Sequence, residues 1–370
     1  MVVAGALANK PWNGGEAWVR LSYVFGLRRL DFRVYFVEQI AAAQCTDEAV
    51  SFFDVVTGTF GLAGASALVR DDGVVLRGPG EEALLDIADD ADLLLNISGN
   101  LTIEPVFDGF RRRAYVDLDP GYTQLWFADG HPVNRLAEHH VHFTVGANVG
   151  TPRCGISVGQ IAWRPTSRPV LLNDWPAVAA PAVEKFTTVA TWRGGYGRLE
   201  RDSVVYGQKA HEFRKLVDLP ARVAVPFEIA LSIDAGDDAD RQSLEEHGWR
   251  LVNPRSVAAT PADYRRYVQE SSAEFSPAQG IYVETNCGWV ADRTACYLAS
   301  GRPAVVQETG LGAEFPVGEG LLTFRTFGDA VQAIDKVRSD WTAHAVAARA
   351  LAAEHFDSDR VLRALLEDAL

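Results

Sequence analysis

The sequence predicts an α/β protein made of two doubly wound domains. Short apolar segments alternate with segments of helical periodicity, and several apolar segments are apolar on both faces, as in sheets covered by helices on both sides. A proline-rich passage interrupts the alternation near the middle. The 370 residues suit two domains, each with a core of its own, and a hydrophobic content of 48% excludes disorder as the dominant state.

The first half begins with an apolar strand over residues 2–7, a loop over 8–15 and a helix. In that helix apolar residues recur at helical spacing, at Ala17, Leu21, Val24, Phe25 and Leu30. Further strands are expected at 33–40, 92–97, 114–118 and 141–145. In such a sheet a ligand binds at the carboxyl ends of the strands.

Three prolines, Pro165, Pro169 and Pro176, mark residues 163–176 as the passage between the domains. The alternation then resumes. Strands are expected at 186–192, 228–233, 249–252, 280–284 and 303–307. Helices are expected at 208–217, 238–247, 261–270, 292–300 and 327–337, with two more between 341 and 370.

Charge and composition exclude several classes of partner. The net charge of -14 predicts no binding to nucleic acid, whose phosphates need clustered cations, and none to an anionic membrane. No apolar run reaches the roughly 20 residues of a transmembrane helix. The N-terminal segment lacks the basic region of a signal peptide, and the 4 cysteines form no C-x-x-C pair. We therefore expect a cytoplasmic protein in a reducing compartment.

The first loop contains Gly14 and Gly15, followed by Glu16. Glycines allow a close approach of the backbone to a ligand, and a helix start favours an anion. The spacing matches neither the dinucleotide fingerprint nor the P-loop. A simple turn, with Glu16 at the positive end of a helix, is the alternative.

Asp117-Leu118-Asp119-Pro120 closes a predicted strand. Two carboxylates at this spacing are typical of the metal site of metal-dependent sugar transferases, and also of the nucleophile and acid/base pair of haloacid-dehalogenase-like phosphatases. A strand end with a turn at Asp-Pro is the structural alternative.

The histidines near position 140 could bind a metal ion. His140 and His142 share one face of a strand, but no Cys or Glu pattern accompanies them, so buried or surface histidines are the favoured interpretation and no metal is expected. His131 lies in a loop, where it is a candidate proton acceptor.

Cations precede and open a helix in the second half. Arg193 lies in a glycine-containing loop after a strand, and Lys209 follows at the start of a helix. Positioned Arg and Lys side chains stabilise a departing diphosphate without a metal. A solvated basic helix face is the alternative.

Residues 280–306 form the most informative segment. Gly288 lies in a turn, Asp292 can cap a helix that ends at Gly301, and Pro303 opens an apolar strand. This pattern resembles the donor-binding domain of GT-B fold glycosyltransferases, as in glycosyltransferase families 1 and 4. The resemblance extends more loosely over the whole chain, from the glycines of the first loop to the last helices.

The resemblance implies two Rossmann-like domains that face each other across a cleft. Residues 1–165 would bind the acceptor, 176–345 the nucleotide sugar, and 346–370 would form a helix that packs back on the first domain. Donor contacts are implied at Arg193, Lys209, Gly288, Asp292, Arg293, Thr294, Thr309 and Gly310. Acceptor contacts are implied at Gly14, Gly15 and Tyr122. An inverting transfer would need a base, with Glu16, Asp119 or His131 as candidates, whereas a retaining transfer would not need a base in the same place, and the sequence leaves both open. No metal and no cofactor are implied.

Two positions depart from the family's pattern. The acidic pair that often holds the donor is replaced by Gly288 and Cys296. Glycosyl transfer to a hydroxyl acceptor is the leading hypothesis. The alternatives are a phosphohydrolase that uses Asp117 and Asp119, and a binding protein for a nucleotide sugar without catalytic activity.

Overall fold

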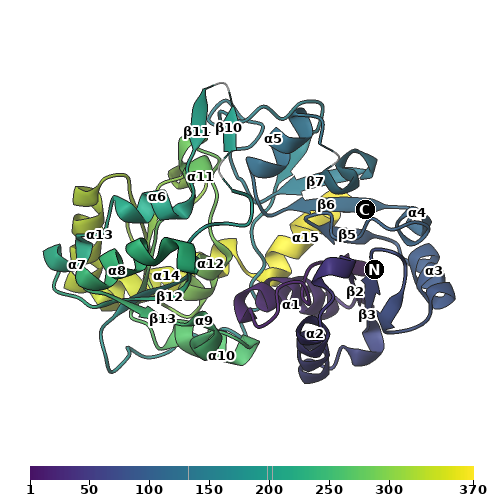
Figure 1. Cartoon of the computed structure of the whole chain (residues 1–370), viewed down its shortest axis with the longest axis horizontal. Coiled ribbons are helices and arrows are strands. Elements are labelled where there is room, and N and C mark those ends of the chain that lie inside the picture. The colour runs from purple at the N-terminus through teal and green to yellow at the C-terminus, as the bar shows by residue number, and fades with distance from the viewer. Residues whose placement is uncertain (132, 198, 202) are drawn as a thin grey trace. The chain divides into compact units, whose positions relative to one another are not determined.

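The computed structural model describes residues 1–131, 133–197, 199–201 and 203–370. The chain forms two compact units (Figure 1). The first unit comprises residues 1–150, 156–171 and 357–370, and the second comprises 151–155 and 172–356. Each unit contains a predominantly parallel sheet.

The sheet of the first unit has the strand order β4-β3-β2-β1-β5-β6-β7-β8 and is parallel except between β3 and β4. Its strands are β1 (Val2–Ala4), β2 (Tyr35–Ile40), β3 (Ser66–Arg70), β4 (Val75–Arg77), β5 (Leu94–Ile97), β6 (Arg113–Asp117), β7 (Val141–Thr144) and β8 (Trp163–Pro165). The order reverses direction between β1 and β5, which makes that position the switch point of the sheet.

The α-helices of the first unit are α1 (Gly14–Arg29), α2 (Asp47–Thr59), α3 (Glu81–Asp90), α4 (Val106–Gly109), α5 (Tyr122–Ala128) and α15 (Ser358–Ala369). Short 3-10 turns lie at Ala42–Gln44, Ala63–Ala65 and Val133–Glu138. The last helix, α15, packs beside α1, the first (Figure 1). Gly26 allows this close approach, because a Cβ there would lie 2.4 Å from the Leu362 side chain.

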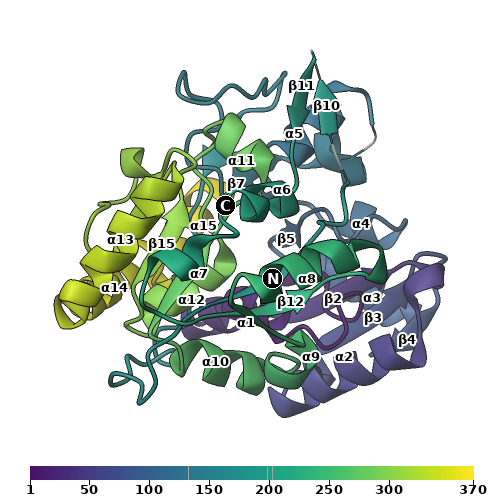
Figure 2. The same ribbon diagram turned by 60° about the vertical axis from the view of Figure 1, so that its left-hand side comes forward.

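The sheet of the second unit is parallel, with the order β13-β12-β9-β14-β15-β16. Its strands are β9 (Phe186–Thr191), β12 (Phe227–Ser232), β13 (Trp249–Val252), β14 (Ala273–Ser276), β15 (Ala304–Gln307) and β16 (Leu321–Phe324). A separate antiparallel hairpin, β10 (Leu199–Arg201) with β11 (Val204–Tyr206), lies between β9 and the next helix (Figure 2). The switch point of this sheet lies between β9 and β14.

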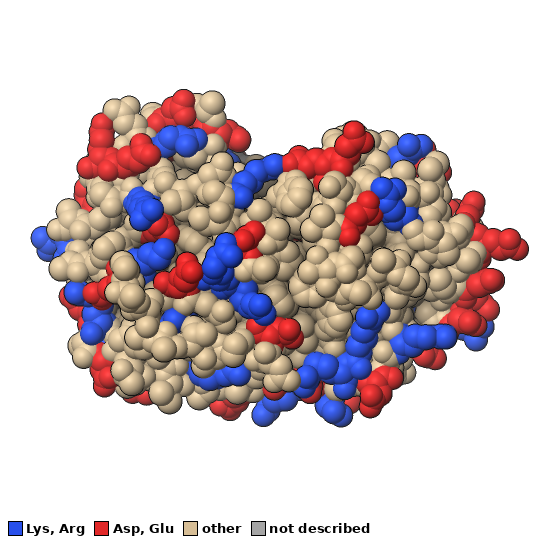
Figure 3. Space-filling view, turned by 90° about the horizontal axis from the view of Figure 1, so that it is seen from below, with Lys and Arg blue, Asp and Glu red and all other residues tan. Residues whose placement is uncertain are grey.

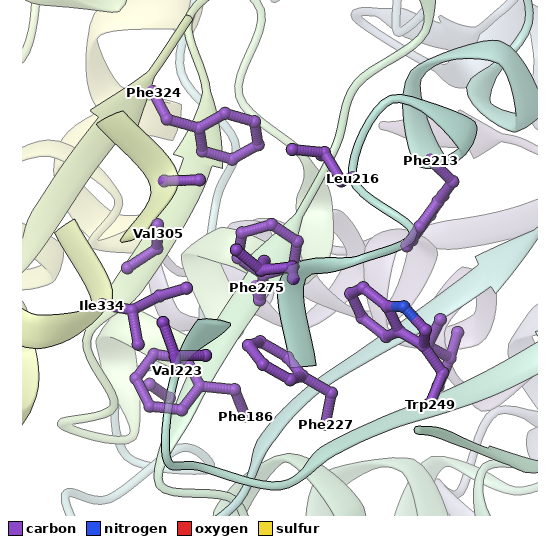
Figure 4. Close-up of a cluster of buried hydrophobic side chains, with 14 of the residues drawn as sticks. Phe186, Phe213, Leu216, Val223, Phe227, Trp249, Phe275, Val305, Phe324 and Ile334 are labelled. Carbon is purple, nitrogen blue, oxygen red and sulfur yellow. The ribbon is translucent and has the colours of Figure 1, made fainter. Parts of the chain in front are cut away.

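The α-helices of the second unit are α6 (Lys209–Arg214), α7 (Leu219–Arg222), α8 (Asp238–Glu246), α9 (Pro254–Val257), α10 (Pro261–Gln269), α11 (Gly280–Glu284), α12 (Asp292–Ala299), α13 (Phe327–Ser339) and α14 (Trp341–His355). Short 3-10 turns lie at Ala235–Asp237 and Leu311–Ala313. An aromatic-rich core covers one face of the sheet, with Phe186, Phe227 and Phe275 from adjacent strands at its centre (Figure 4).

The alternation of side chains along β14 places two polar residues opposite this core. Ala273 and Phe275 belong to the aromatic core, so Glu274 and Ser276 point to the other face of the sheet. Both polar residues are buried there.

Most expected elements are confirmed with shifts of a few residues at their ends, but one strand assignment is wrong. Residues 280–284 form the helix α11, and the strand of this region is β14, several residues earlier. Glu274 is charged and interrupts the apolar pattern of β14, so the sequence did not indicate a strand there. The region 163–176, expected to be a linker, contains the edge strand β8 and a bridge between Val170 and Asp357.

Among the described residues, no helix is both long and apolar enough to cross a lipid bilayer.

Candidate functional site

The switch point of the second unit gathers polar groups at the carboxyl ends of β9 and β14. The loops that follow these two strands touch, because a Cβ on Gly194 would lie 3.2 Å from the side-chain amide of Gln279. Lys209 begins α6 after the loop and hairpin that follow β9, and Gly280 begins α11 after β14. A ligand of a doubly wound sheet binds at this position.

Lys209 is a buried lysine that has no counter-ion in direct contact among the described residues. Its exposed fraction is 9%. Within the described residues, its ammonium group forms neither a hydrogen bond nor an ion pair, and the charges that act on it are those of Arg293 and Glu274. Desolvation lowers the pKa of Lys209 well below its ordinary value, and the neighbouring Arg293 lowers it further. Burial of an unpaired cation is costly, which indicates an anion as its partner.

Glu274 and Arg293 form a buried ion pair beside Lys209. Arg293 Nε lies 2.9 Å from Glu274 Oε1, without the alignment of a hydrogen bond, and Arg293 Nη2 donates to Ser276 Oγ. Glu274 has an exposed fraction of 0%. Desolvation raises the pKa of Glu274, and the charge of Arg293 opposes this.

A small pocket opens next to this ion pair, at the carboxyl ends of β14 and β15. Its lining combines hydroxyl and amide groups with apolar side chains: Ser276, Ala278, Trp289, Val290, Ala291, Thr294, Val306 and Gln307. The Trp289 ring stacks on Tyr282 at a centroid distance of 4.3 Å. The pocket therefore offers polar groups and one aromatic wall beside the guanidinium of Arg293.

The structure brings together three of the residues expected at the donor. Gly288 N donates to Thr309 O at 2.6 Å, and Thr309 Oγ1 donates to Trp289 O. The amides themselves are occupied, since Gly310 N donates to the Glu308 carboxylate at 2.6 Å. These loops can shape a ligand site, but in this conformation Gly288 and Gly310 do not offer their N–H groups to a phosphate.

The sequence suggested that Asp292 caps its helix, but in the structure it does not. The N-cap of α12 is Ala291, and Asp292 occupies the first turn, where its charge favours the positive helix end. Thr294, on the same helix, is buried and lines the pocket. Gly301 ends the helix with a φ of 68°, as expected for a glycine stop.

Arg193 has a partner of its own. Its guanidinium forms a forked pair with Asp237, with Nη2 to Oδ1 at 2.6 Å and Nε to Oδ2 at 2.7 Å, and Nη1 donates to Gln208. Arg193 and Lys209, both implied at the diphosphate by the family resemblance, thus differ in their surroundings. Arg293 donates to Ser276 of the pocket and interacts electrostatically with Lys209, whereas the charge of Arg193 is balanced by Asp237.

The first loop of the first unit binds an internal carboxylate. Ala8 N and Asn9 N donate to Glu38 at 2.5 and 2.9 Å. Gly14 and Gly15 belong to the first turn of α1, whose cap is Asn13. Desolvation raises the pKa of Glu38 to about 7, against the effect of these hydrogen bonds. A phosphate has no open amide nest at Ala8 and Asn9.

Glu16 forms an ion pair with Arg20, and Arg168 and Lys10 add further positive charge. The pKa of Glu16 is lowered, because these cations outweigh the desolvation of the carboxylate. Arg20 and Arg168 are themselves buried, with exposed fractions of 6% and 5%. Glu16 is thus ionised at neutral pH, but it is a weak base.

Asp117 is part of the internal framework. Thr123, Gln124 and Thr144 donate to its two oxygens at 2.7 to 2.8 Å, and the Asp119 amide donates as well. Burial raises the pKa of Asp117. A carboxylate with these bonds and no exposure does not attack phosphorus, so the phosphohydrolase hypothesis is not favoured.

Asp119 and Tyr122 follow β6 at the carboxyl edge of the sheet. Asp119 is partly exposed, whereas Tyr122 is buried and packs on Trp126. Burial and the Asp119 charge raise the pKa of Tyr122 to about 12. His131 is exposed in the loop after α5. Its neighbour Pro132 lies outside the described residues.

The histidines near β7 hold a loop to the sheet. His139 Nδ1 donates to Arg135 O, His139 Nε2 accepts from Asn96, and His142 Nε2 donates to Leu136 O. In the part of the chain that the structure describes, no three His, Cys, Asp or Glu side chains are placed to hold a metal ion.

Sequence reasoning missed Glu274, Ser276 and Gln307. The signal for Glu274 was present as an acid within an apolar strand. Ser276 and Gln307 carried no signal, because their importance comes from lying at the ends of two adjacent strands.

Solved structures support the fold of both units. HepE of Anabaena, in complex with UDP and glucose, is 13% identical, with a TM-score of 0.60 over 99% of this chain and 98% of that chain. An alpha-glucosyltransferase in complex with UDP-glucose and DNA is 11% identical, with a TM-score of 0.58 over 99% and 97%. A putative UDP-N-acetylglucosamine 2-epimerase from Listeria monocytogenes is 11% identical, with a TM-score of 0.52 over 99% and 94%.

No protein-family model matches the sequence, and a search of curated proteins gave no match. At these identities the similarity concerns the fold, and the proteins named include both an alpha-glucosyltransferase and a putative 2-epimerase. The chain therefore has the GT-B fold, with two Rossmann-like units.

Proposed function

We propose that the protein is a glycosyltransferase that moves a sugar from a nucleoside diphosphate sugar to a hydroxyl acceptor. The observation that carries this proposal is the buried Lys209, which has no ion-pair partner among the described residues and interacts electrostatically with Arg293 near the switch point of the second sheet. A diphosphate supplies the negative charge that this position lacks. The GT-B fold is shared with solved proteins that hold UDP or UDP-glucose, which favours such a donor.

The donor would bind to the second unit. Lys209 and Arg293 would face the diphosphate, and the hydroxyl groups of Ser276 and Thr294 would contact the donor in the adjacent pocket. The loops at Gly288, Asp292, Thr309 and Gly310 would form the walls. Arg193, held by Asp237, would contribute at longer range.

The acceptor would bind to the first unit, near Gly14, Gly15 and Tyr122. Of the three candidate bases, Asp119 is the best placed, because it is partly exposed at the carboxyl edge of β6. Glu16 is weakened by its pairing with Arg20. His131 is the alternative base.

Nucleic acid is not the acceptor that we propose. The net charge is -14, and on the face drawn in Figure 3 cationic and anionic side chains are interspersed. A DNA-binding face needs clustered cations. Likewise we propose no metal requirement, since Lys209 and Arg293 would face the diphosphate.

Binding and turnover test this function separately. UDP should bind the full chain, and Lys209→Gln should weaken that binding at least about tenfold, or about 1.4 kcal/mol. The control Lys336→Gln removes the same charge from an exposed lysine of the second unit and should leave affinity unchanged. Calorimetry gives both affinities, and equal affinity in the two variants would contradict the proposed site.

Product analysis distinguishes transfer from other reactions of the same fold. Incubation of UDP-sugars with a panel of hydroxyl acceptors should give glycosylated product, and a chelator should not reduce the rate. Epimerised sugar nucleotide without transfer would replace the proposal with an isomerase.

A further inference from the structure

Glu274 occupies an unusual position for a carboxylate. It lies on β14, the strand beside the switch point, with an exposed fraction of 0%. Thr187 is its register partner on β9, and the Thr187 hydroxyl is engaged with Ser271 and Tyr297. Burial of a carboxylate is costly unless it is paired, so its role has to be sought in the cations around it.

Those cations are Arg293 and Lys209. Arg293 Nε lies 2.9 Å from Glu274 Oε1, and the guanidinium reaches past it to Ser276 at the pocket. The Glu274 oxygens accept no well-aligned hydrogen bond from the described residues. The cluster therefore combines one arginine, one lysine and one carboxylate, and the carboxylate oxygens have no well-aligned hydrogen bond among the described residues.

The surroundings of Lys209 contain few charges that could replace Glu274. The charged groups that act on it are Arg293 from α12 and Glu274 from β14. Glu212, on the same helix as Lys209, already accepts hydrogen bonds from Lys215 and Gln307. Of the groups that act on Lys209, Glu274 alone raises its pKa, while desolvation and Arg293 lower it.

We propose that Glu274 is a positioning residue of the diphosphate site, which aims Arg293 at the ligand, and that nucleotide binding is coupled to proton uptake by Lys209, to an extent that Glu274 limits. This proposal rests on the proposed function. A diphosphate beside the Lys209 amine adds negative charge and raises the pKa of Lys209. The lysine therefore takes up a proton from solution when the nucleotide enters.

The experiment is calorimetry of UDP binding to the full chain at one pH in buffers of different ionisation enthalpy. The dependence of the observed enthalpy on the buffer gives the number of protons taken up. We expect a fractional uptake by the wild type and a loss of affinity as the pH rises. Glu274→Gln should weaken UDP binding about tenfold, increase proton uptake and move the loss of affinity to lower pH.

Two further variants make the result specific. Lys209→Arg keeps a cation that does not titrate, so it should abolish proton uptake while retaining measurable affinity. Glu284→Gln removes an exposed carboxylate of the same unit and should behave as the wild type. If Glu274→Gln does not fold, the comparison of wild type with Lys209→Arg still decides the question.

The outcomes separate the two proposals. Proton uptake that disappears in Lys209→Arg supports the coupling. Tight UDP binding with an enthalpy independent of the buffer overturns the coupling and leaves the proposed function intact. Absence of UDP binding to the wild type overturns the proposed function, and this inference falls with it.

Discussion

In this protein, burial and contacts determine the chemical properties of single residues. The family resemblance implied both Lys209 and Arg193 at the diphosphate, yet Lys209 is buried without an ion-pair partner among the described residues, whereas Arg193 forms a forked pair with Asp237. Asp117 and Asp119 also differ, because the first is bonded on all sides and the second is partly exposed. The residue types were visible in the sequence, but their charge states depend on neighbours from distant segments.

We predict that Arg193→Gln weakens UDP binding much less than Lys209→Gln does. Asp237 already balances the Arg193 charge, so its removal changes the field at the pocket only slightly. Calorimetry on the two variants side by side measures the difference. Equal losses of affinity would show that Arg193 exchanges Asp237 for the phosphate.

Because His139 is buried, we predict that the stability of the protein decreases as the pH falls. Burial lowers the pKa of His139 to about 4, whereas an exposed histidine titrates near 6.5. As the pH falls, the unfolded chain therefore binds a proton at this histidine before the folded chain does. The stabilisation is complete above pH 6.5 and is lost as the pH falls towards 4, by about 3 kcal/mol at most.

Denaturant unfolding at several pH values measures this loss. His139→Gln should be less stable at pH 7 and should show a shallower fall in acid. The matched control is His140→Gln at the exposed neighbouring position, which should retain most of the wild-type pH dependence. An unchanged slope in His139→Gln would assign the acid sensitivity to other groups.

At the scale of elements, the ends of helices and strands fix the site. Helix α11 was expected to be a strand, and its start is packed against the residue two positions before Lys209. Gly280 N donates to Gly207 O at 2.9 Å. This contact connects the loop after β14 to the start of α6, and so sets the position of the lysine.

We predict that Gly280→Ala destabilises the second unit and weakens UDP binding. The new Cβ would lie 2.7 Å from Gly207 N and 2.8 Å from Gly207 O, and backbone atoms cannot turn away. A cost of about 1–3 kcal/mol is typical of such overpacking. Thermal unfolding and UDP titration measure the two effects.

Gly236→Ala is the control, because a Cβ there meets nothing within 4 Å. It should change stability by less than about 0.5 kcal/mol. If the Gly280→Ala variant bound UDP with wild-type affinity, the position of the start of α6 would not depend on its contact with α11.

At the scale of the whole chain, the C-terminal helix completes the first unit. Asp357–Leu370 belongs to that unit, whereas α14, which precedes it, belongs to the second. Arg29 and Asp359 pair across the contact between α1 and α15. The expected boundary at 346 thus lies inside α14, and the chain changes unit near residue 357.

We predict that Leu362→Ala destabilises the first unit by about 2–5 kcal/mol, because Leu362 is fully buried against Gly26. UDP binding, which we place in the second unit, should survive. Hydrogen exchange locates the loss, and protection should fall in α1 and the strands near it. Equal loss of protection in both units would show that they unfold together.

The sequence by itself determined the fold class and most of the elements, because hydrophobic periodicity and glycine and proline stops are local signals. It also determined the motif from Gly288 to Gly301, the segment that carried the family resemblance. Only the tertiary structure decided which charges meet. Glu274, Arg293 and Lys209 come from three elements, and their pairing, burial and proton affinity arise from packing, which no local pattern encodes.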